Sequence, residues 1–246
     1  MEQRECGIMG ILVYIGILLL LSYGIIPSFV IRFADINRRK KLLDETDFHD
    51  KTIYLTFDDG PSSLYTAELL ALLKQYEIHA TFFVVGEFAN QNPKLLQQMK
   101  TDGHTIGMHS YCHKNAILQR WGTTYSDFTK TVITMDKLGY SCVYYRPPWG
   151  HINLCTLYMV KKLGVKMLLW DVMAQDWEKK ATVDSISNKI MKRTTPGSVI
   201  CLHDGRGAKG APKKTIQALR ITLPLLLEQG YRFGNLGETY GKKVFF

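Results

Sequence analysis

The chain has 246 residues, of which 46% are hydrophobic and 22% charged, with 20 glycines and 8 prolines. This composition excludes collagen-like, disordered and disulfide-scaffold proteins and leaves room for one large α/β domain. A formal net charge of +9 does not by itself choose between nucleic acid, anionic lipid and an acidic polymer as the partner. Because the basic residues form no stripe interleaved with aromatic residues, we expect no nucleic-acid binding.

The N-terminal segment is apolar. Residues 7–31 carry no charge, and a bilayer core needs only about 20 apolar residues, so we predict a transmembrane anchor after a short tail, residues 1–6. The alternative is a cleaved signal sequence, which would have a basic start, a shorter apolar region and small residues before the cut. Residues 32–50 are charged and patternless and predict a linker to a domain over residues 51–246.

From residue 52 onward, short β-like runs alternate with helix-like ones, which is typical of a parallel sheet with crossover helices. The predicted strands are residues 52–57, 80–85, 104–109, 141–146, 166–170, 198–203 and 231–235. The predicted helices are residues 65–76, 93–102, 125–138, 154–163 and 183–193. We expect Asn92 to cap the second helix, with Pro93 in its first turn.

Residues able to do chemistry end or follow five of these seven strands. They are Asp58-Asp59, His109 with His113, Arg146-Pro147-Pro148-Trp149-Gly150, Asp176-Trp177 and His203-Asp204. A barrel of parallel strands places all of its C-terminal strand ends on one face. The pattern therefore predicts an α/β fold, a distorted and incomplete (β/α) barrel with seven strands rather than eight, and one site at its mouth.

Two of these clusters together suggest a metal site. His109 and His113 are four residues apart, one helical turn, so their rings can converge on an ion. The Asp pair adds a hard oxygen ligand, and two His with one carboxylate indicate a catalytic site with an open position. Adjacent residues at a strand end point in different directions, so one Asp can bind metal while the other acts as a base. The alternative for Asp-Asp-Gly-Pro is a simple turn.

In five ordered motifs the chain resembles the polysaccharide deacetylases of the NodB-homology class, the carbohydrate esterase family 4 type. The motifs are Thr56-Phe57-Asp58-Asp59-Gly60-Pro61, His109-Ser110-x-x-His113, Arg146-Pro147-Pro148-Trp149-Gly150, Asp176-Trp177 and Leu202-His203-Asp204. The resemblance covers roughly residues 52–235. It implies metal-dependent hydrolysis of N-acetyl groups on an N-acetylated sugar polymer or oligomer, with release of acetate.

The resemblance also implies a role for each residue. Asp59, His109 and His113 would hold a divalent ion, most simply Zn²⁺ with Co²⁺ or another ion as alternatives, which polarises the amide carbonyl and acidifies a water. Asp58 would take the proton from that water, held ionised and oriented by Arg146. The alternative for Arg146 is a structural ion pair at a strand end.

On the other side of the substrate, the resemblance implies that His203, kept protonated by Asp176, donates a proton to the leaving amine. A backbone N–H near Trp149 would help to stabilise the oxyanion. Trp149, Trp177 and the apolar stretch around Leu202 would shape the pocket for substrate, although the two tryptophans could instead be core aromatics. The chain departs from many relatives at Met173, where they have a carboxylate, and at Cys201, where they have Leu. These departures bear on substrate fit.

We expect a monomer that acts on a cell-envelope glycan, peptidoglycan first and chitin-type oligosaccharides second. The alternatives are an O-acetyl ester hydrolase of xylan-like polymers and a non-catalytic glycan-binding domain, against which the presence of Asp58 and His203 argues. Five basic residues follow the apolar span and only Arg4 precedes it, which favours a cytoplasmic domain. An envelope polymer is available only outside, so the expected function favours an extracytoplasmic domain.

Overall fold

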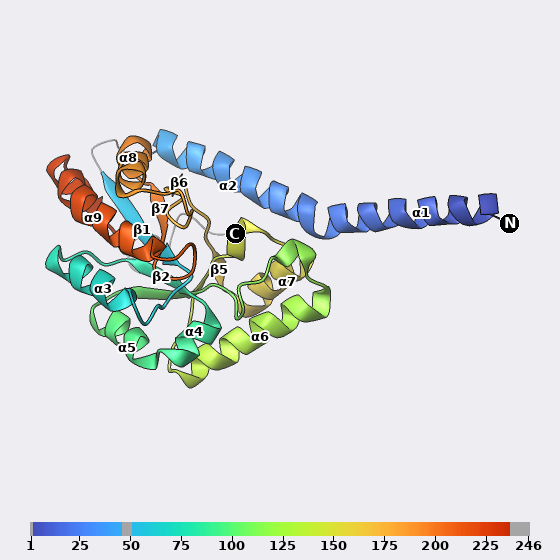
Figure 1. Cartoon of the computed structure of the whole chain (residues 1–246), viewed down its shortest axis with the longest axis horizontal. Coiled ribbons are helices and arrows are strands. Elements are labelled where there is room, and N and C mark those ends of the chain that lie inside the picture. The colour runs from blue at the N-terminus through green and yellow to red at the C-terminus, as the bar shows by residue number, and fades with distance from the viewer. Residues whose placement is uncertain (1, 46–50, 237–246) are drawn as a thin grey trace.

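The structure is a computed structural model that describes residues 2–45 and 51–236. Figure 1 shows a central parallel sheet surrounded by helices, with one long helix that projects away from it at the N-terminal end. Every strand pair is parallel. The C-terminal strand ends therefore meet on one face, as predicted.

The sheet follows one continuous path of seven strands in the order β5-β4-β3-β2-β1-β7-β6. Their bounds are β1 Thr52–Asp58, β2 Thr81–Val84, β3 Thr105–Met108, β4 Tyr144–Tyr145, β5 Lys166–Met167, β6 Val172–Met173 and β7 Val199–His203. An eighth strand, β8 (Arg232–Phe233), pairs only with the beginning of β1. The predicted distorted, seven-stranded barrel is confirmed, but two residues of β6 that had no recognisable pattern take the place expected for residues 231–235.

The segment between β5 and β6 closes the barrel. These two strands lie at opposite ends of the path, yet only residues 168–171 separate them in the chain. The backbone N–H of Leu168 donates to the carbonyl of Tyr145 at 3.0 Å, and that of Asp171 donates to the carbonyl of Val199 at 2.9 Å. Residues 168–171 thus run from a hydrogen bond with β4 to a hydrogen bond with β7, and they cover the gap between the two ends of the sheet.

All five predicted helices are present, as α3 (Thr66–Gln75), α5 (Pro93–Thr101), α6 (Trp121–Lys137), α7 (Leu154–Leu163) and α8 (Val183–Arg193). The start of α7 has a physical cause, since the Asn153 side chain accepts from the backbone N–H of Thr156 at 2.8 Å. Asn92 occupies the N-cap position of α5 with Pro93 in the first turn, as predicted, but its side chain makes no capping bond, because its amide donates back to the carbonyl of Phe88 at 2.9 Å. Helices α4 (Gly86–Gln91) and α9 (Ala211–Glu228) were not predicted; α9 contains Pro224, a residue that usually ends a helix.

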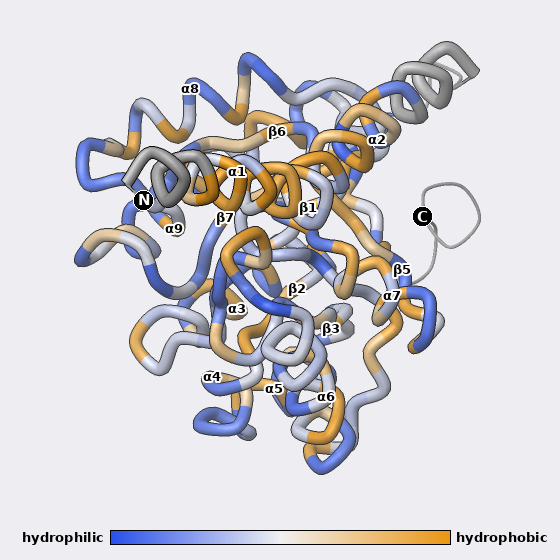
Figure 2. The backbone as a smooth tube through the Cα atoms, turned by 90° about the vertical axis from the view of Figure 1, so that its right-hand side faces the viewer, coloured by the Kyte–Doolittle hydropathy of each residue, from blue (hydrophilic) through white to orange (hydrophobic). Residues whose placement is uncertain are grey.

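The N-terminal part is helical throughout, as α1 (Glu2–Leu20), a π-helical turn η1 (Leu21–Ile25) and α2 (Ile26–Glu45). Residues 8–37 are long and apolar enough to cross a membrane. Figure 2, seen from the side of α1, shows the apolar α1 in front of the domain. Residues 32–45 are helical where a patternless linker was predicted, and residues 46–50 of that linker lie outside the described residues, as do residue 1 of the tail and residues 237–246 of the domain.

The end of the predicted anchor contacts protein instead of standing clear of it. Residues 8–20 are exposed, whereas Gly24, Pro27, Ser28 and Asp35 are buried at helical spacing. A Cβ at Gly24 would lie 3.2 Å from the Cα of Ile117, and the backbone N–H of Ile152 donates to the Ser28 hydroxyl at 2.8 Å. Because these residues pack on the barrel, a bilayer has only the chain before about residue 24 to accommodate.

Candidate active site

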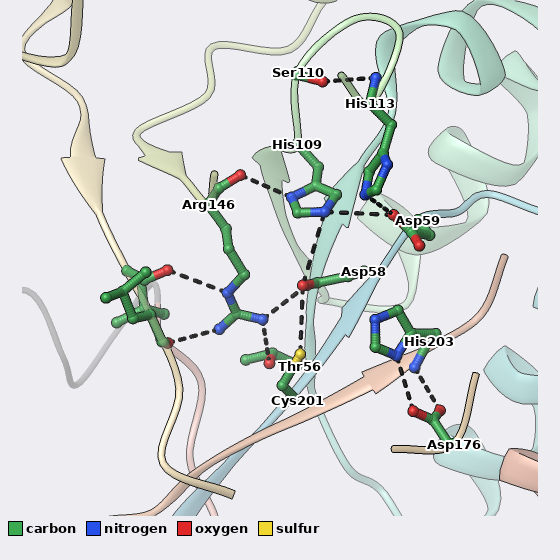
Figure 3. A network of polar contacts seen from close by, with 12 residues as sticks. Thr56, Asp58, Asp59, His109, Ser110, His113, Arg146, Asp176, Cys201 and His203 are labelled. Atoms are coloured by element: carbon green, nitrogen blue, oxygen red, sulfur yellow. Dashed lines mark hydrogen bonds and ion pairs between the residues drawn. The ribbon is translucent and has the colours of Figure 1, made fainter. Parts of the chain in front are cut away.

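The C-terminal ends of β1, β3, β4 and β7 and the chain after β6 bring together most of the residues that the motifs singled out. Figure 3 shows those that make polar contacts. They surround a cavity of about 330 Å³. Its lining includes Asp58, Asp59, His109, His113, Trp149, Trp177 and His203. Segments up to 145 positions apart in the chain, from Asp58 to His203, therefore form one pocket.

Asp59, His109 and His113 form a buried group suited to a metal ion. Their ligand atoms all lie within 4.8 Å of one another. The Asp59 Oδ1 atom is 2.8 Å from Nε2 of His113 and 3.4 Å from Nε2 of His109, and it has no hydrogen-bond partner within the described part of the chain. Buried polar atoms in native proteins are nearly always satisfied. A divalent cation that binds all three atoms would satisfy this one.

A second contact orients His109 for this purpose. Its Nδ1 atom lies 2.7 Å from the backbone carbonyl of Arg146. A carbonyl only accepts hydrogen bonds, so Nδ1 carries the proton and Nε2 presents a lone pair toward Asp59. Such a contact to the outer nitrogen is typical of metal-binding histidines. The set of one carboxylate and two imidazoles fits Zn²⁺ and other divalent ions of the same class.

The two histidines converge by a route that differs from the predicted helical turn. Residues 109–113 form a loop, with positive φ angles of 65° at Ser110 and 52° at His113. The His113 N–H donates to the Ser110 hydroxyl at 2.8 Å. The carboxylate of Asp127 on α6 accepts from the N–H groups of Tyr111 and Cys112 at 2.8 and 3.2 Å. Asp127 thus supports the loop, a role for which the sequence offered no motif.

The charges of the group are consistent with cation binding. Burial alone would raise the pKa of Asp59, but its contacts with His109 and His113 outweigh burial and lower that pKa well below its usual value. Burial is the main reason that the pKa of His113 is lowered. Both shifts favour an anionic carboxylate beside a neutral imidazole, the forms that bind metal.

Asp58 points away from Asp59 and is held by Arg146. Its Oδ1 atom accepts from the Arg146 guanidinium at 2.8 Å, and its Oδ2 atom is 3.9 Å from Nε2 of His109. The Cys201 thiol donates to the same Oδ2 atom at 3.4 Å. The carboxylate therefore lies next to the metal group without belonging to it, as a base acting on water at that group requires.

Arg146 is fully buried, which costs free energy unless its charge and all donors are satisfied. It donates to the hydroxyl of Thr56 at 2.7 Å and to the carbonyls of Leu168 and Leu169 at 3.2 and 3.0 Å. The last two belong to the segment that closes the barrel. Barrel closure and the orientation of Asp58 thus depend on the same guanidinium.

His203 and Asp176 form a second charged pair on the other side of the cavity. Their Nδ1 and Oδ1 atoms are 2.9 Å apart, and Asp176 Oδ2 accepts from the backbone N–H of His203 and from the Thr215 hydroxyl, both at 2.8 Å. Burial alone would lower the pKa of His203, but Asp176, with smaller contributions from Asp59 and Asp58, raises it to about 9. The imidazole therefore carries a proton at neutral pH.

Aromatic rings form the walls of the cavity. The Trp149 ring is half exposed, has a positive φ of 55° and lies 4.3 Å from the His113 ring. The Trp177 ring lies 4.9 Å from the ring of His203. Trp170, which also lines the cavity, was missed, although it stands at the end of a predicted strand, where a pocket residue is expected.

The structure does not bring Leu202 to the pocket. Leu202 is fully buried in the core, whereas its neighbours Cys201 and His203 line the cavity. Successive strand residues point to opposite faces, so Leu202 on β7 must point the other way. Met173 and Cys201, the two departures from the motif pattern, both line the cavity.

Comparisons with known proteins show which family the chain resembles. The profile of the family described as "Polysaccharide deacetylase" matches residues 45–168. A peptidoglycan-N-acetylglucosamine deacetylase, PgdA, of Listeria monocytogenes is 35% identical over 196 residues, which are 79% of this chain and 40% of that protein. The chain thus spans less than half the length of that relative. A peptidoglycan-N-acetylglucosamine deacetylase of Bacillus cereus is also 35% identical, over 79% of this chain and 90% of its own length.

The fold is likewise similar to a solved structure. The crystal structure of the Bc1960 peptidoglycan N-acetylglucosamine deacetylase superimposes with a TM-score of 0.73 at 31% identity. The match covers 80% of this chain and 92% of that one.

Proposed function

The chain belongs to the polysaccharide deacetylase family, and we propose that it hydrolyses N-acetyl groups on the sugars of a cell-envelope polysaccharide, releasing acetate. The main support for the proposal is that a candidate base and a candidate acid lie beside the same metal-binding group. Asp58 lies 3.9 Å from a histidine of that group, and His203 lines the same cavity with its proton held by Asp176.

In the proposed mechanism Asp58 starts the reaction. A divalent ion held by Asp59, His109 and His113 supplies, when bound, polarisation of the amide carbonyl and a lowered pKa for water. Asp58 takes a proton from the attacking water, whose oxygen forms a bond to the amide carbon. Arg146 keeps the Asp58 carboxylate ionised and in place through its contact at 2.8 Å.

His203 completes the reaction. It gives its proton to the amine nitrogen as the carbon–nitrogen bond breaks, so that water and amide yield acetate and a free amine. The backbone N–H near Trp149 is proposed to help stabilise the oxyanion. The rings of Trp149 and Trp177 are proposed to shape the pocket for the substrate. Trp149 and Trp177 line the same cavity as the two proton-transfer residues, which supports this assignment.

Peptidoglycan is the substrate that we propose first, because relatives at 35% identity are described as peptidoglycan-N-acetylglucosamine deacetylases. A chitin-type oligosaccharide is the second candidate. An O-acetyl ester of a xylan-like glycan needs the same base and the same metal group, and a glycan-binding domain without catalysis would need neither Asp58 nor His203. We further propose Zn²⁺ as the metal and a monomeric catalytic domain over residues 51–246.

Acetate release from a panel of N-acetylated and O-acetylated glycans tests the proposal. We expect release from peptidoglycan by the full chain in detergent with Zn²⁺ supplied. The Asp58→Asn variant should bind the metal but lose about 10²–10⁴-fold in turnover, the usual effect of removing a general base. Release only from O-acetylated glycans would indicate the esterase. No release from any glycan would favour the binding domain.

We also propose that α1 is an uncleaved membrane anchor and that the domain lies outside the membrane. Support comes from the contacts of the following turn, since Gly24 and Ser28 pack against Ile117 and Ile152 of the domain. A signal sequence removed by cleavage would take a helix surface away from these buried contacts. The proposed substrate is an envelope polymer, which is available only outside the membrane.

A further inference from the structure

A second cavity of about 250 Å³ lies beside the active site, and helix α2 forms one of its walls. Its lining includes Ser28, Phe29 and Arg32 from α2 and Trp149, His151 and Trp170 from the barrel. Trp149 and Trp170 also line the catalytic cavity. The two cavities are therefore neighbours that share two tryptophans in their walls.

Specific contacts hold α2 in this position. The Arg32 guanidinium donates to the backbone carbonyl of Trp170 at 3.1 Å and lies 5.3 Å from the centre of its ring. The buried Asp35 lies 3.9 Å from Arg32, one turn further along the helix. The Ser28 hydroxyl accepts from the N–H of Ile152 at 2.8 Å. The wall is thus built before any ligand arrives, which reduces the entropy lost on binding.

The exposed aromatic rings and the size of the cavity identify the kind of ligand. Phe29 is 73% exposed and Trp149 is 52% exposed, although most large apolar side chains of a folded domain are buried. At about 30 Å³ for each water in the liquid, the cavity of about 250 Å³ has room for about eight waters, the size of one sugar ring. Aromatic rings can pack against the apolar C–H face of such a ring.

The charge of the cavity is also informative. Arg32 is the only residue of its lining with a full charge, and no carboxylate lines it within the described part of the chain. A neutral N-acetylated sugar or one with an anionic substituent is compatible with this guanidinium, whereas an amine would be repelled.

We propose that α2 completes a second sugar subsite, which binds the ring next to the one that is deacetylated. This inference rests on the proposed function, since it assigns the neighbouring unit of the same glycan chain to the cavity that shares Trp149 with the catalytic pocket. The helix that leads to the membrane thereby becomes part of the substrate-binding surface.

A pair of phenylalanines on α2 provides a matched test. Phe29 lines the cavity, whereas Phe33, one turn later and 67% exposed, does not. In the full chain in detergent, Phe29→Ala should lower kcat/KM for a tetrasaccharide of N-acetylglucosamine about five- to tenfold, mainly through KM, as expected for one lost aromatic contact. Phe33→Ala should leave it unchanged, and Phe29→Tyr, which keeps the ring, should restore it. Because both side chains are exposed, neither substitution threatens the fold.

The dependence on substrate length completes the test. The effect of Phe29→Ala should shrink on the shortest oligosaccharide that the unmodified chain hydrolyses. Equal kcat/KM for Phe29→Ala and Phe33→Ala on the tetrasaccharide would overturn the proposal. The proposal would also be overturned if adding phosphatidylglycerol to the micelles lowered kcat/KM of the unmodified chain to the level of Phe29→Ala. The cavity would then hold lipid. Absence of acetate release by the unmodified chain would instead refute the proposed function.

Discussion

The pair of His203 and Asp176 allows a prediction about pH. Replacing Asp176 by Asn removes a negative charge and keeps the shape of the side chain. The amide oxygen can still accept from the His203 N–H and from Thr215, which now contact Oδ2 at 2.8 Å. The amide NH₂ would then face Nδ1 of His203, an arrangement that suits the neutral imidazole because NH₂ can only donate.

The magnitude follows from the two pKa values. The pKa of His203 is raised from 6.5 to about 9, so the unmodified chain keeps this proton up to about pH 9 and loses activity above it. In Asp176→Asn, burial still lowers this pKa while Asp59 and Asp58 still raise it. If these effects balance and the pKa is about 6.5, the protonated fraction falls about 4-fold at pH 7 and about 75-fold at pH 8.5. The variant should therefore have a defect that grows with pH, and the alkaline limb of its pH–rate profile should move down by about 2.5 pH units.

Initial rates of acetate release between pH 5.5 and 10 measure this shift. Thr215→Val serves as the control, because it removes one hydrogen bond to Asp176 at 2.8 Å but leaves the carboxylate charge. Its alkaline limb should stay in place. A constant loss of activity at every pH in Asp176→Asn would refute the reasoning, since the carboxylate would then act on geometry alone. An unchanged limb would remove His203 from the role of acid.

Two further predictions concern the metal group and the membrane. Asp59→Ala should lose the divalent ion that the unmodified full chain holds at about one per molecule, whereas Asp58→Asn should retain it. Elemental analysis after gel filtration measures the metal content. Stoichiometric metal in Asp59→Ala would contradict the assigned ligands. A cysteine placed at the exposed Lys94 on α5 should react in intact cells with a membrane-impermeant thiol reagent, above the background of the unmodified chain. Labelling of that position only after lysis would put the domain in the cytoplasm.

The sequence alone was sufficient to predict the barrel and to place most of the motif residues in one pocket. Parallel strands require their C-terminal ends to meet on one face, so the residues after each strand could be assigned to one pocket before any contact was known. Asp58, Asp59 and His203 follow this rule directly. The short run of apolar residues in β1 and the capped helix α7 are local signals of the same kind, because burial and capping act over a few residues.

Local patterns failed where a contact depends on distant residues. The loop from His109 to His113 was predicted as a helical turn, but its shape is supported by Asp127 on α6. Leu202 was assigned to the pocket with the rest of its motif, although a strand turns alternate residues to opposite faces. The prediction assigned the whole Leu202-His203-Asp204 motif to the pocket, whereas the Leu202 side chain points to the opposite face of the sheet from that of His203.

The apolar helix shows what only the tertiary structure decided. Its composition predicted a membrane span over residues 7–31 and a linker after it, because hydropathy does not distinguish lipid from protein as the apolar surroundings. The structure places Gly24 and Ser28 against the barrel and Phe29 beside the active site. Residues on α2 and on the loop after β4 are more than a hundred positions apart, so no sequence period relates them. Their proximity depends on packing between surfaces that exist only after the barrel has formed.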